Sequence, residues 1–290
     1  MKKYVKYAMG VLALIIIACC IASYLFPLFF QPEITCESTI YNDSGSPKII
    51  IGEPPVLWDT GNGETILFRD FAEKKYRVGL SLVFDFHREW RILCRYFSRK
   101  IYLDPFTIKN ALYTMEKKEK LSPFIKNSGE AGILGMDVIG KANWLIDFSE
   151  KSIQSISHND TVSFRQQSKF SLSYRKTKRP KTTLTIQDCE IKDILIDSGS
   201  DADMIMLETD IQQIKHNLSP TDSVDRTSSG LFSGSIPEKQ YIFRNIVING
   251  YRFDNLSITQ SKTNRLIGMG FFRKFDKVYL NTEEKIFRFY

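Results

Sequence analysis

The sequence predicts a mostly β protein made of two similar lobes behind an N-terminal membrane anchor. Three observations lead to this expectation. Segments rich in β-branched and aromatic residues recur along most of the chain. Residues 56–61 (VLWDTG) and 194–199 (ILIDSG) both carry an apolar run into an aspartate, a hydroxyl residue and a glycine. Residues 8–30 form an uncharged and almost wholly apolar stretch.

The stretch at residues 8–30 predicts a transmembrane helix. At about 1.5 Å per residue it is long enough to cross a bilayer core of about 30 Å. Three lysines precede it, so the N-terminus is expected in the cytoplasm and the rest of the chain outside it, on a single-pass protein of the cell membrane. A cleaved signal peptide would have a shorter apolar region and a small-x-small exit, which residues 29–31 (FFQ) do not supply. Lipid attachment at Cys19, within residues 16–19 (IIAC), is the alternative tether.

The composition bounds what the rest of the chain does. With 290 residues, 43% of them hydrophobic, the protein has enough apolar material for one large core or two ordinary ones. The formal charge is +7, and Lys2, Lys3 and Lys6 account for three of these charges. The small remainder, mixed with acidic residues, argues against nucleic-acid binding. The basic run at residues 175–181 (RKTKRPK) is interpreted as a solvated loop or hairpin tip.

Cysteine and histidine usage predicts no metal and no other cofactor. Beyond the anchor, Cys36, Cys94 and Cys189 have no CxxC spacing, and the three histidines are separated from one another. One disulfide among these cysteines is compatible with the sequence, which does not indicate the pair.

Four signals recur in the same order in the two halves of the chain. The aspartate turns at Asp59 and Asp197 are followed by GILGMDVIGK (residues 132–141) and LIGMGFFRK (residues 266–274). Next come LIDFSEK (residues 145–151) and YLNTEEK (residues 279–285). This indicates two copies of one unit. We therefore divide the chain into an anchor (1–32), an N-terminal lobe (33–157) and a C-terminal lobe (158–290).

The individual elements follow from local pattern. Strands are expected within residues 184–196, 241–250 and 285–290, with a tight hairpin at Asn249-Gly250. Helices are expected at residues 104–121 and 207–218. Turn residues at 42–47 open the first lobe, and the polar segment 158–168 is the expected link between the lobes.

The paired aspartates call for a chemical reason. A carboxylate at the end of a buried strand is unfavourable unless other groups compensate for it. A glycine two residues later lets backbone N–H groups approach the carboxylate, and a hydroxyl between them braces the turn. Two such turns, each with a matching downstream element, predict that the two carboxylates work together.

These residues resemble the aspartic proteases of the pepsin/retropepsin superfamily. The resemblance lies in D-T-G at 59–61, D-S-G at 197–199 and the hydrophobic-hydrophobic-glycine elements at 133–135 and 266–268, and it extends over about residues 48–290. It implies a bilobal pepsin-like fold of two pseudo-symmetric β-barrel-like lobes, with each hydrophobic-hydrophobic-glycine element behind the aspartate turn of its own lobe. The chain looks like two retropepsin-sized units fused into one.

The resemblance also implies an activity, that of a membrane-anchored aspartic endopeptidase. Asp59 and Asp197 would share one proton, because two adjacent carboxylates do not both ionise cheaply, and would activate a water that attacks a peptide bond. The expected substrate is a polypeptide outside the cytoplasm. Because one chain carries both aspartates, we expect an active monomer.

Supporting roles follow from the same resemblance. Thr60 and Ser198 are expected to brace the two turns, and Gly61 and Gly199 to admit the backbone. The next residues, Asn62 and Ser200, are candidates to hydrogen-bond the outer carboxylate oxygens.

Two departures from the family pattern leave an alternative open. Asn62 stands where the family has a small or hydroxyl residue. In the second lobe, residues 228–234 (SSGLFSG) suit a flap over the substrate, whereas residues 82–103 of the first lobe contain no glycine. A stiffer hairpin is the candidate flap there. Trp90 or Tyr96 of this hairpin could face the cleft, but such aromatics belong more often to the core, and we leave them out of the catalytic set. The alternative is a catalytically silent fold that acts as an envelope peptide-binding or scaffold module.

Overall fold

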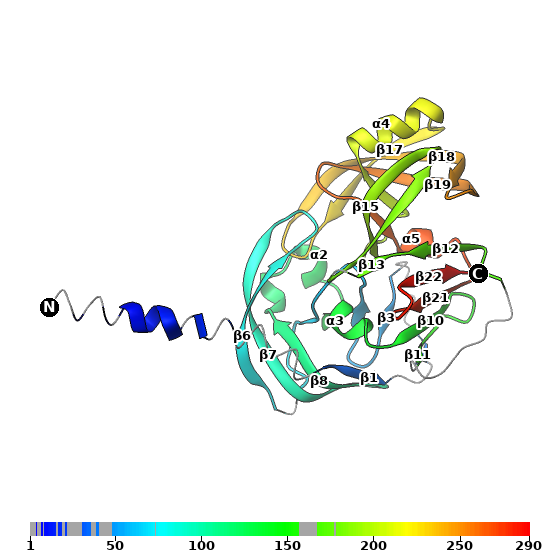
Figure 1. Cartoon of the computed structure of the whole chain (residues 1–290). Coiled ribbons are helices and arrows are strands. Elements are labelled where there is room, and N and C mark those ends of the chain that lie inside the picture. Colours follow the sequence, from blue (N-terminus) through cyan, green and yellow to red (C-terminus); the bar gives the residue numbers. More distant parts are fainter. Residues whose placement is uncertain are drawn as a thin grey trace.

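The computed structural model describes residues 31–35, 39–40, 48–72, 74–156, 167–176 and 178–290, together with helical positions at 4, 7, 9–15, 17–18 and 21 (Figure 1). Among these residues, no helix combines the length and the apolar character that a membrane span requires. Much of the predicted anchor at 8–30, the turn at 42–47 and nearly all of the link at 158–168 lie outside the described residues.

The described chain is mostly β and is organised into three sheets. The first sheet belongs to the N-terminal half and has the strand order β3-β4-β9-β5-β8-β7-β6, with β1 paired to β8. Its strands are β1 (Glu33–Thr35), β3 (Ile50–Ile51), β4 (Val56–Trp58), β5 (Ile66–Leu67), β6 (Tyr76–Phe84), β7 (Trp90–Leu103), β8 (Phe106–Met115) and β9 (Gly132–Leu134).

The second sheet belongs to the C-terminal half and has the order β13-β14-β15-β20-β16-β19-β18-β17. Its strands are β13 (Arg175–Lys176), β14 (Pro180–Ile186), β15 (Cys189–Asp197), β16 (Met204–Leu207), β17 (Asp222–Ser229), β18 (Ser235–Ile248), β19 (Tyr251–Ser261) and β20 (Leu266–Gly268).

The two sheets repeat one pattern of pairing. In the first, β4 is parallel to β9, β9 is antiparallel to β5, and β5 is parallel to β8. In the second, β15, β20, β16 and β19 are joined in the same sequence of parallel, antiparallel and parallel pairs. The internal repeat of the sequence is therefore matched by a repeat of strand pairing, and in both copies the strand that leads into the aspartate lies beside the strand that leads into the apolar glycine element.

A third sheet joins the two halves. Its order is β12-β22-β21-β10-β11-β2. Its strands are β2 (Thr39–Ile40), β10 (Asn143–Asp147), β11 (Ser152–Ile156), β12 (Phe170–Ser173), β21 (Lys277–Asn281) and β22 (Ile286–Phe289). The central contact is β10 against β21, where the repeated segments LIDFSEK and YLNTEEK meet antiparallel with Leu145 opposite Tyr279. The halves are thus connected by continuous backbone pairing and a shared apolar core.

Short helices complete the fold, and one of them was predicted. These are the 3-10 helix η1 (Lys118–Lys120) and the α-helices α2 (Pro123–Lys126), α3 (Met136–Ile139), α4 (Glu208–Asn217) and α5 (Met269–Phe272). The helix expected at 207–218 is confirmed as α4, whose Ile211 and Ile214 are buried. α3 and α5 begin directly after Gly135 and Gly268, at equivalent places in the two halves.

The helix expected at residues 104–121 is wrong. This segment forms strand β8 and then η1. Phe106 and Ile108 are buried while Lys109 is exposed, which is the alternation of a strand, and nearly all of β8 pairs with the long strand β7. The tertiary pairing overrides the helical propensity of the lysine- and glutamate-rich end of the segment.

The expected hairpin at Asn249-Gly250 is confirmed. It joins β18 to β19, and both residues have positive φ, at 47° and 81°. Asparagine and glycine tolerate this left-handed backbone, which suits the twist of a two-residue hairpin.

Candidate active site

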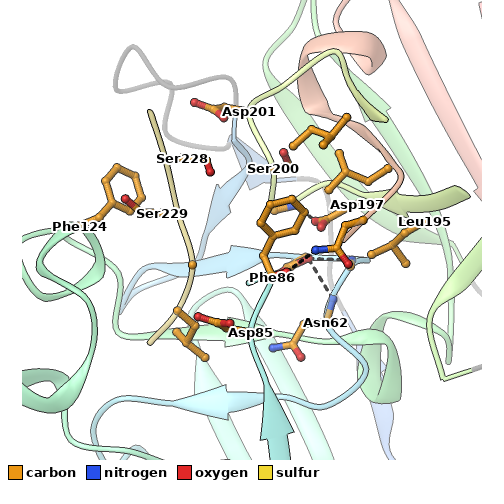
Figure 2. Close-up of a pocket in the computed structure, with 18 of the residues that line it drawn as sticks. Asn62, Asp85, Phe86, Phe124, Leu195, Asp197, Ser200, Asp201, Ser228 and Ser229 are labelled. Atoms are coloured by element: carbon orange, nitrogen blue, oxygen red, sulfur yellow. Dashed lines mark hydrogen bonds between the residues drawn. The ribbon is translucent and has the colours of Figure 1, made fainter. Parts of the chain in front are cut away.

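Asp59 and Asp197 lie together on the floor of a cleft of about 1240 Å³. Asp59 directly follows β4 and Asp197 ends β15. The two carboxyl groups are hydrogen-bonded to each other although they are 138 positions apart in the chain. Figure 2 shows Asp197 with several other residues that line this cleft. The repeated strand pairing carries both acids to one point.

Each aspartate is held by its own turn. The N–H groups of Gly61 and Asn62 donate to Oδ1 of Asp59 at 2.7 and 3.1 Å. The N–H of Gly199 donates to Oδ1 of Asp197 at 3.0 Å. The apolar glycine elements lie alongside, since the N–H of Asp59 donates to the carbonyl of Leu134 at 3.0 Å and Asp197 lies opposite Gly268 in the β15–β20 pair. Both carboxyls therefore have fixed positions before any ligand enters.

The two glycines make room for the opposite carboxyl group. A Cβ at Gly61 would lie 2.1 Å from Cγ of Asp197, and a Cβ at Gly199 would lie 2.5 Å from Cγ of Asp59. Among the described glycines, positive φ occurs at Gly52 and Gly250, not at these two. Access of the backbone within one turn, the role expected from the sequence, therefore explains only part of the need for glycine at these two positions. Any side chain here would push the two acids apart.

Thr60 and Ser198 brace the site across the two halves. The N–H of Thr60 donates to Oγ of Ser198 at 2.9 Å, and the N–H of Ser198 donates to Oγ1 of Thr60 at 3.1 Å. Each hydroxyl then donates onward to the opposite strand, Thr60 to the carbonyl of Ile196 at 2.8 Å and Ser198 to that of Trp58 at 2.9 Å. Both side chains are fully buried. The sequence suggested bracing within each turn, whereas these hydrogen bonds tie one turn to the other.

Asn62 and Ser200 take other roles than the expected ones. Asn62 contributes its backbone N–H to Asp59. The Ser200 hydroxyl accepts a hydrogen bond from the N–H of Ala202 at 3.4 Å instead of reaching the carboxyl of Asp197. Both residues line the cleft. Their side chains are therefore placed to contact a ligand more than to hold the acids.

The surroundings separate the two aspartates electrostatically. Burial, followed by the charge of Asp197, raises the pKa of Asp59 well above its ordinary value. Burial also raises the pKa of Asp197, but hydrogen bonds from Asp59 and Gly199 and the charges of Arg179 and Lys48 counter the effect. The pair therefore holds one proton between its two carboxyl groups, and the charges and hydrogen bonds around Asp197 favour its ionised form.

Two hairpins meet over this cleft. The tip between β6 and β7 presents Asp85, whose Oδ2 accepts hydrogen bonds from the N–H of Phe232, the N–H of Ser233 and the hydroxyl of Ser233 at 3.1, 2.9 and 2.8 Å. Phe232 and Ser233 belong to the tip between β17 and β18. In addition, Ser228 bonds His87 at 3.2 Å. The two tips are thus latched to each other, one from each half of the chain.

Neither Trp90 nor Tyr96 lines the cleft, in agreement with their omission from the catalytic set. The aromatic residues of this hairpin that line the cleft are Phe84 and Phe86, and Figure 2 shows Phe86 and Asp197 among the cleft residues. Trp90 points to the surface, and Tyr96 stacks on Tyr113. The hairpin reaches the cleft with its tip, where Asp85, Phe86 and Arg88 line it, and not with the middle of its strands.

Several residues that shape the cleft were missed by the sequence reasoning. Lys48 and Arg179 lie close enough to act on the charge of the pair, and Nη1 of Arg179 donates to the carbonyl of Gly61 at 3.5 Å. Arg179 and Lys181 belong to the basic run at 175–181. The antiparallel pairing of β13 with β14 confirms that this run forms a hairpin tip, and Arg179 is exposed, but both residues also line the cleft. The density of basic residues at 175–181 is the feature of the sequence that could have pointed to Arg179 and Lys181.

Within the part of the chain that the structure describes, no group of three or more histidine, cysteine or acidic residues is arranged to hold a metal ion. Cys94 and Cys189 are free thiols, which removes that pair from the disulfides compatible with the sequence, and Cys36 lies outside the described residues.

A scan of protein-family models and a search of curated proteins find no match to this chain.

Proposed function

We propose that this protein is an aspartic endopeptidase with a bilobal pepsin-like fold. The observation that carries the proposal is the pair of hydrogen-bonded carboxyl groups, Asp59 and Asp197, on the floor of a cleft large enough for several residues of an extended peptide. The matching strand order of the two halves and the reciprocal hydrogen bonds of Thr60 and Ser198 support it. The glycines that fit only beside a carboxyl group support it further.

The proposed reaction uses one proton and one water. Ionised Asp197 takes a proton from a water held between the two acids, and the resulting hydroxide attacks the peptide carbonyl carbon. Protonated Asp59 donates a hydrogen bond to the carbonyl oxygen as negative charge develops there. The carbon–nitrogen bond then breaks, the proton held by Asp197 passes to the leaving nitrogen, and the pair returns to its singly protonated state.

The proposal includes a location and an alternative. The apolar stretch at residues 8–30 supports anchoring in the cell membrane with the protease body outside the cytoplasm. The latched hairpins over the cleft favour the alternative of a silent peptide-binding or scaffold module, because a substrate cannot enter from that side until Asp85 releases the opposite tip.

The test uses variants of the full chain that lack one of the two aspartates of the pair. Wild-type protein, Asp59→Asn, Asp197→Asn and the control Asp254→Asn are incubated with denatured proteins and peptide libraries from about pH 3 to about pH 8. Asp254 is exposed on β19 and is not among the residues that line the cleft, so its variant is expected to retain cleavage. We expect Asp59→Asn and Asp197→Asn to lose cleavage.

A folding control separates chemistry from stability. An acid with a raised folded-state pKa makes the protein less stable as pH rises from the ordinary value of 3.8 through the raised value, because the folded state retains a proton that the unfolded chain has released. Asp59→Asn removes this effect, so its thermal midpoint at pH 7 is expected at or above that of the wild type. Unchanged cleavage by Asp59→Asn would overturn the proposal, and a wild type without reproducible cuts but with peptide binding in the cleft would establish the silent module.

A further inference from the structure

The outer face of the β6–β7 hairpin carries a continuous apolar patch. It consists of five large side chains, each between 52% and 60% exposed: Leu80, Leu82, Phe84, Trp90 and Ile92. The strand register places Leu82 opposite Ile92 and Phe84 opposite Trp90, so the side chains adjoin one another. β6 is the last strand of its sheet, and Figure 1 shows the hairpin along the border of the molecule. We call these five residues the hairpin patch.

The hairpin patch is not needed for the protein core. The alternate residues Val83 and Leu93 point inward and are buried in a cluster with Leu57 and Ile133. Several large apolar side chains side by side in water are unfavourable, and such patches mark a surface that contacts another apolar phase. The patch therefore has a partner outside the folded body.

The chemistry of the patch and its border suits a lipid bilayer. Tryptophan and phenylalanine beside aliphatic residues are the side chains that enter the interfacial zone of a membrane. The exposed cations in the hairpin or next to it are Lys74, Arg77, Arg88 and Arg99, against the exposed acid Glu89, and the exposed Lys75 pairs with Asp70. Excess positive charge next to apolar side chains favours anionic headgroups.

The chain also enters the body through the same sheet. The apolar stretch predicted to span the membrane ends at residue 30, and β1 begins at Glu33. β1 pairs with residues 107–109 of β8, which pair with residues 100–102 of β7, so the chain enters the sheet at the base of the hairpin and the patch lies toward its tip. An anchor at residues 8–30 therefore attaches this sheet to the membrane and keeps the hairpin within reach of lipid, which raises the local concentration of lipid above that of a soluble partner.

We propose that the hairpin patch rests on the surface of the bilayer in which the chain is anchored. Phe84 belongs to the patch and also lines the cleft, and the next residues form the tip that is latched over it. Docking of the patch consequently brings the roof of the cleft next to the membrane. The cleft is then presented to stretches of polypeptide close to the bilayer. This inference rests on the predicted anchor and is independent of whether Asp59 and Asp197 are catalytic.

Trp90 provides a direct test. The chain has three tryptophans, and the other two, Trp58 and Trp144, are fully buried. The full-length protein is reconstituted into lipid nanodiscs that contain brominated phospholipids, and tryptophan quenching is compared with that in discs of unbrominated lipid. We expect quenching by the brominated lipid, and protection of Trp90 from aqueous iodide relative to the protein in detergent. Trp90→Phe removes both signals because the buried pair does not contribute.

Matched variants locate the effect on the patch. Leu82→Ser with Ile92→Ser is expected to reduce the quenching of Trp90 by brominated lipid at least about two-fold. Val224→Ser changes an exposed apolar residue of β17, in the other half of the chain, and is expected to leave the quenching unchanged.

Three results would overturn the inference. The first is equal iodide quenching in discs and in detergent without quenching by lipid. The second is concentration-dependent iodide protection in detergent alone, which would assign the patch to a second copy of the chain. The third is failure of the full chain to enter the discs. Loss of proteolysis in Asp59→Asn with full lipid quenching separates this inference from the proposed activity.

Discussion

Ser198→Ala tests the reasoning about the site most directly. The substitution deletes an oxygen that accepts from the N–H of Thr60 and donates to the carbonyl of Trp58, both at 2.9 Å in a fully buried environment. Leaving a buried backbone group without its partner costs about 1–3 kcal/mol, so the two groups together predict a loss of about 2–6 kcal/mol in the free energy of unfolding. Thr60→Val deletes the equivalent pair of bonds and is expected to cost a similar amount.

Urea unfolding followed by circular dichroism measures this loss, and cleavage of a fluorogenic peptide by the same samples measures its effect on the site. Ser171→Ala on the exposed side of β12 is the matched control, with an expected change below about 0.5 kcal/mol. Because the two hydroxyl groups make four separate hydrogen bonds to backbone groups, the double variant is expected to lose about the sum of the single losses. A change below about 0.5 kcal/mol in Ser198→Ala would refute the view that the two turns are tied to each other.

Three further predictions concern the cleft. Gly61→Ala would put a Cβ 2.1 Å from Cγ of Asp197, so we expect kcat to fall at least about a hundred-fold, and a wild-type rate would contradict the geometry. Lys48→Met and Arg179→Met each remove a positive charge that lowers the pKa of Asp197. The pH profile of kcat/KM is therefore expected to move to higher pH, and a move to lower pH would show that these charges do not lower that pKa. Asp85→Ala deletes the acceptor of three hydrogen bonds from the opposite hairpin tip, so hydrogen exchange of the tip amides is expected to accelerate at least about ten-fold, whereas unchanged exchange would show that the latch is unimportant.

Elements of the fold that depend on a short stretch of sequence were predicted correctly, and an element that depends on pairing with another strand was not. The hairpin at Asn249-Gly250 and helix α4 depend on residues within one short window, and both were predicted. The segment at 104–121 was assigned to the wrong class because its state is decided by pairing with β7, a strand that precedes it in the chain. Propensity within the segment contains no information about that partner.

The two copies of the repeat also differ in ways that their motifs do not reveal. In the first half, Thr65 donates through its N–H and its hydroxyl to Asp137, two residues after Gly135. In the second half the position two residues after Gly268 is Gly270, and the carboxylate next to it comes from Asp203 on the other side of the contact. The equivalent space is thus filled in the first half by an acid that follows the apolar glycine element, Asp137, and in the second half by an acid from the facing segment, Asp203. Only the packing of each half identifies which residue supplies it.

The mostly β character, the duplication and the two aspartate turns with their glycines could be predicted from the amino-acid sequence, because each is encoded in short runs of neighbouring residues. Three features became visible only in the folded chain: Thr60 and Ser198 bond across the two halves, Lys48 and Arg179 act on the acids, and Asp85 latches the two hairpin tips. The physical reason is that hydrogen bonds and charges act over a few ångströms of space, and most of these partners lie more than a hundred positions apart along the chain.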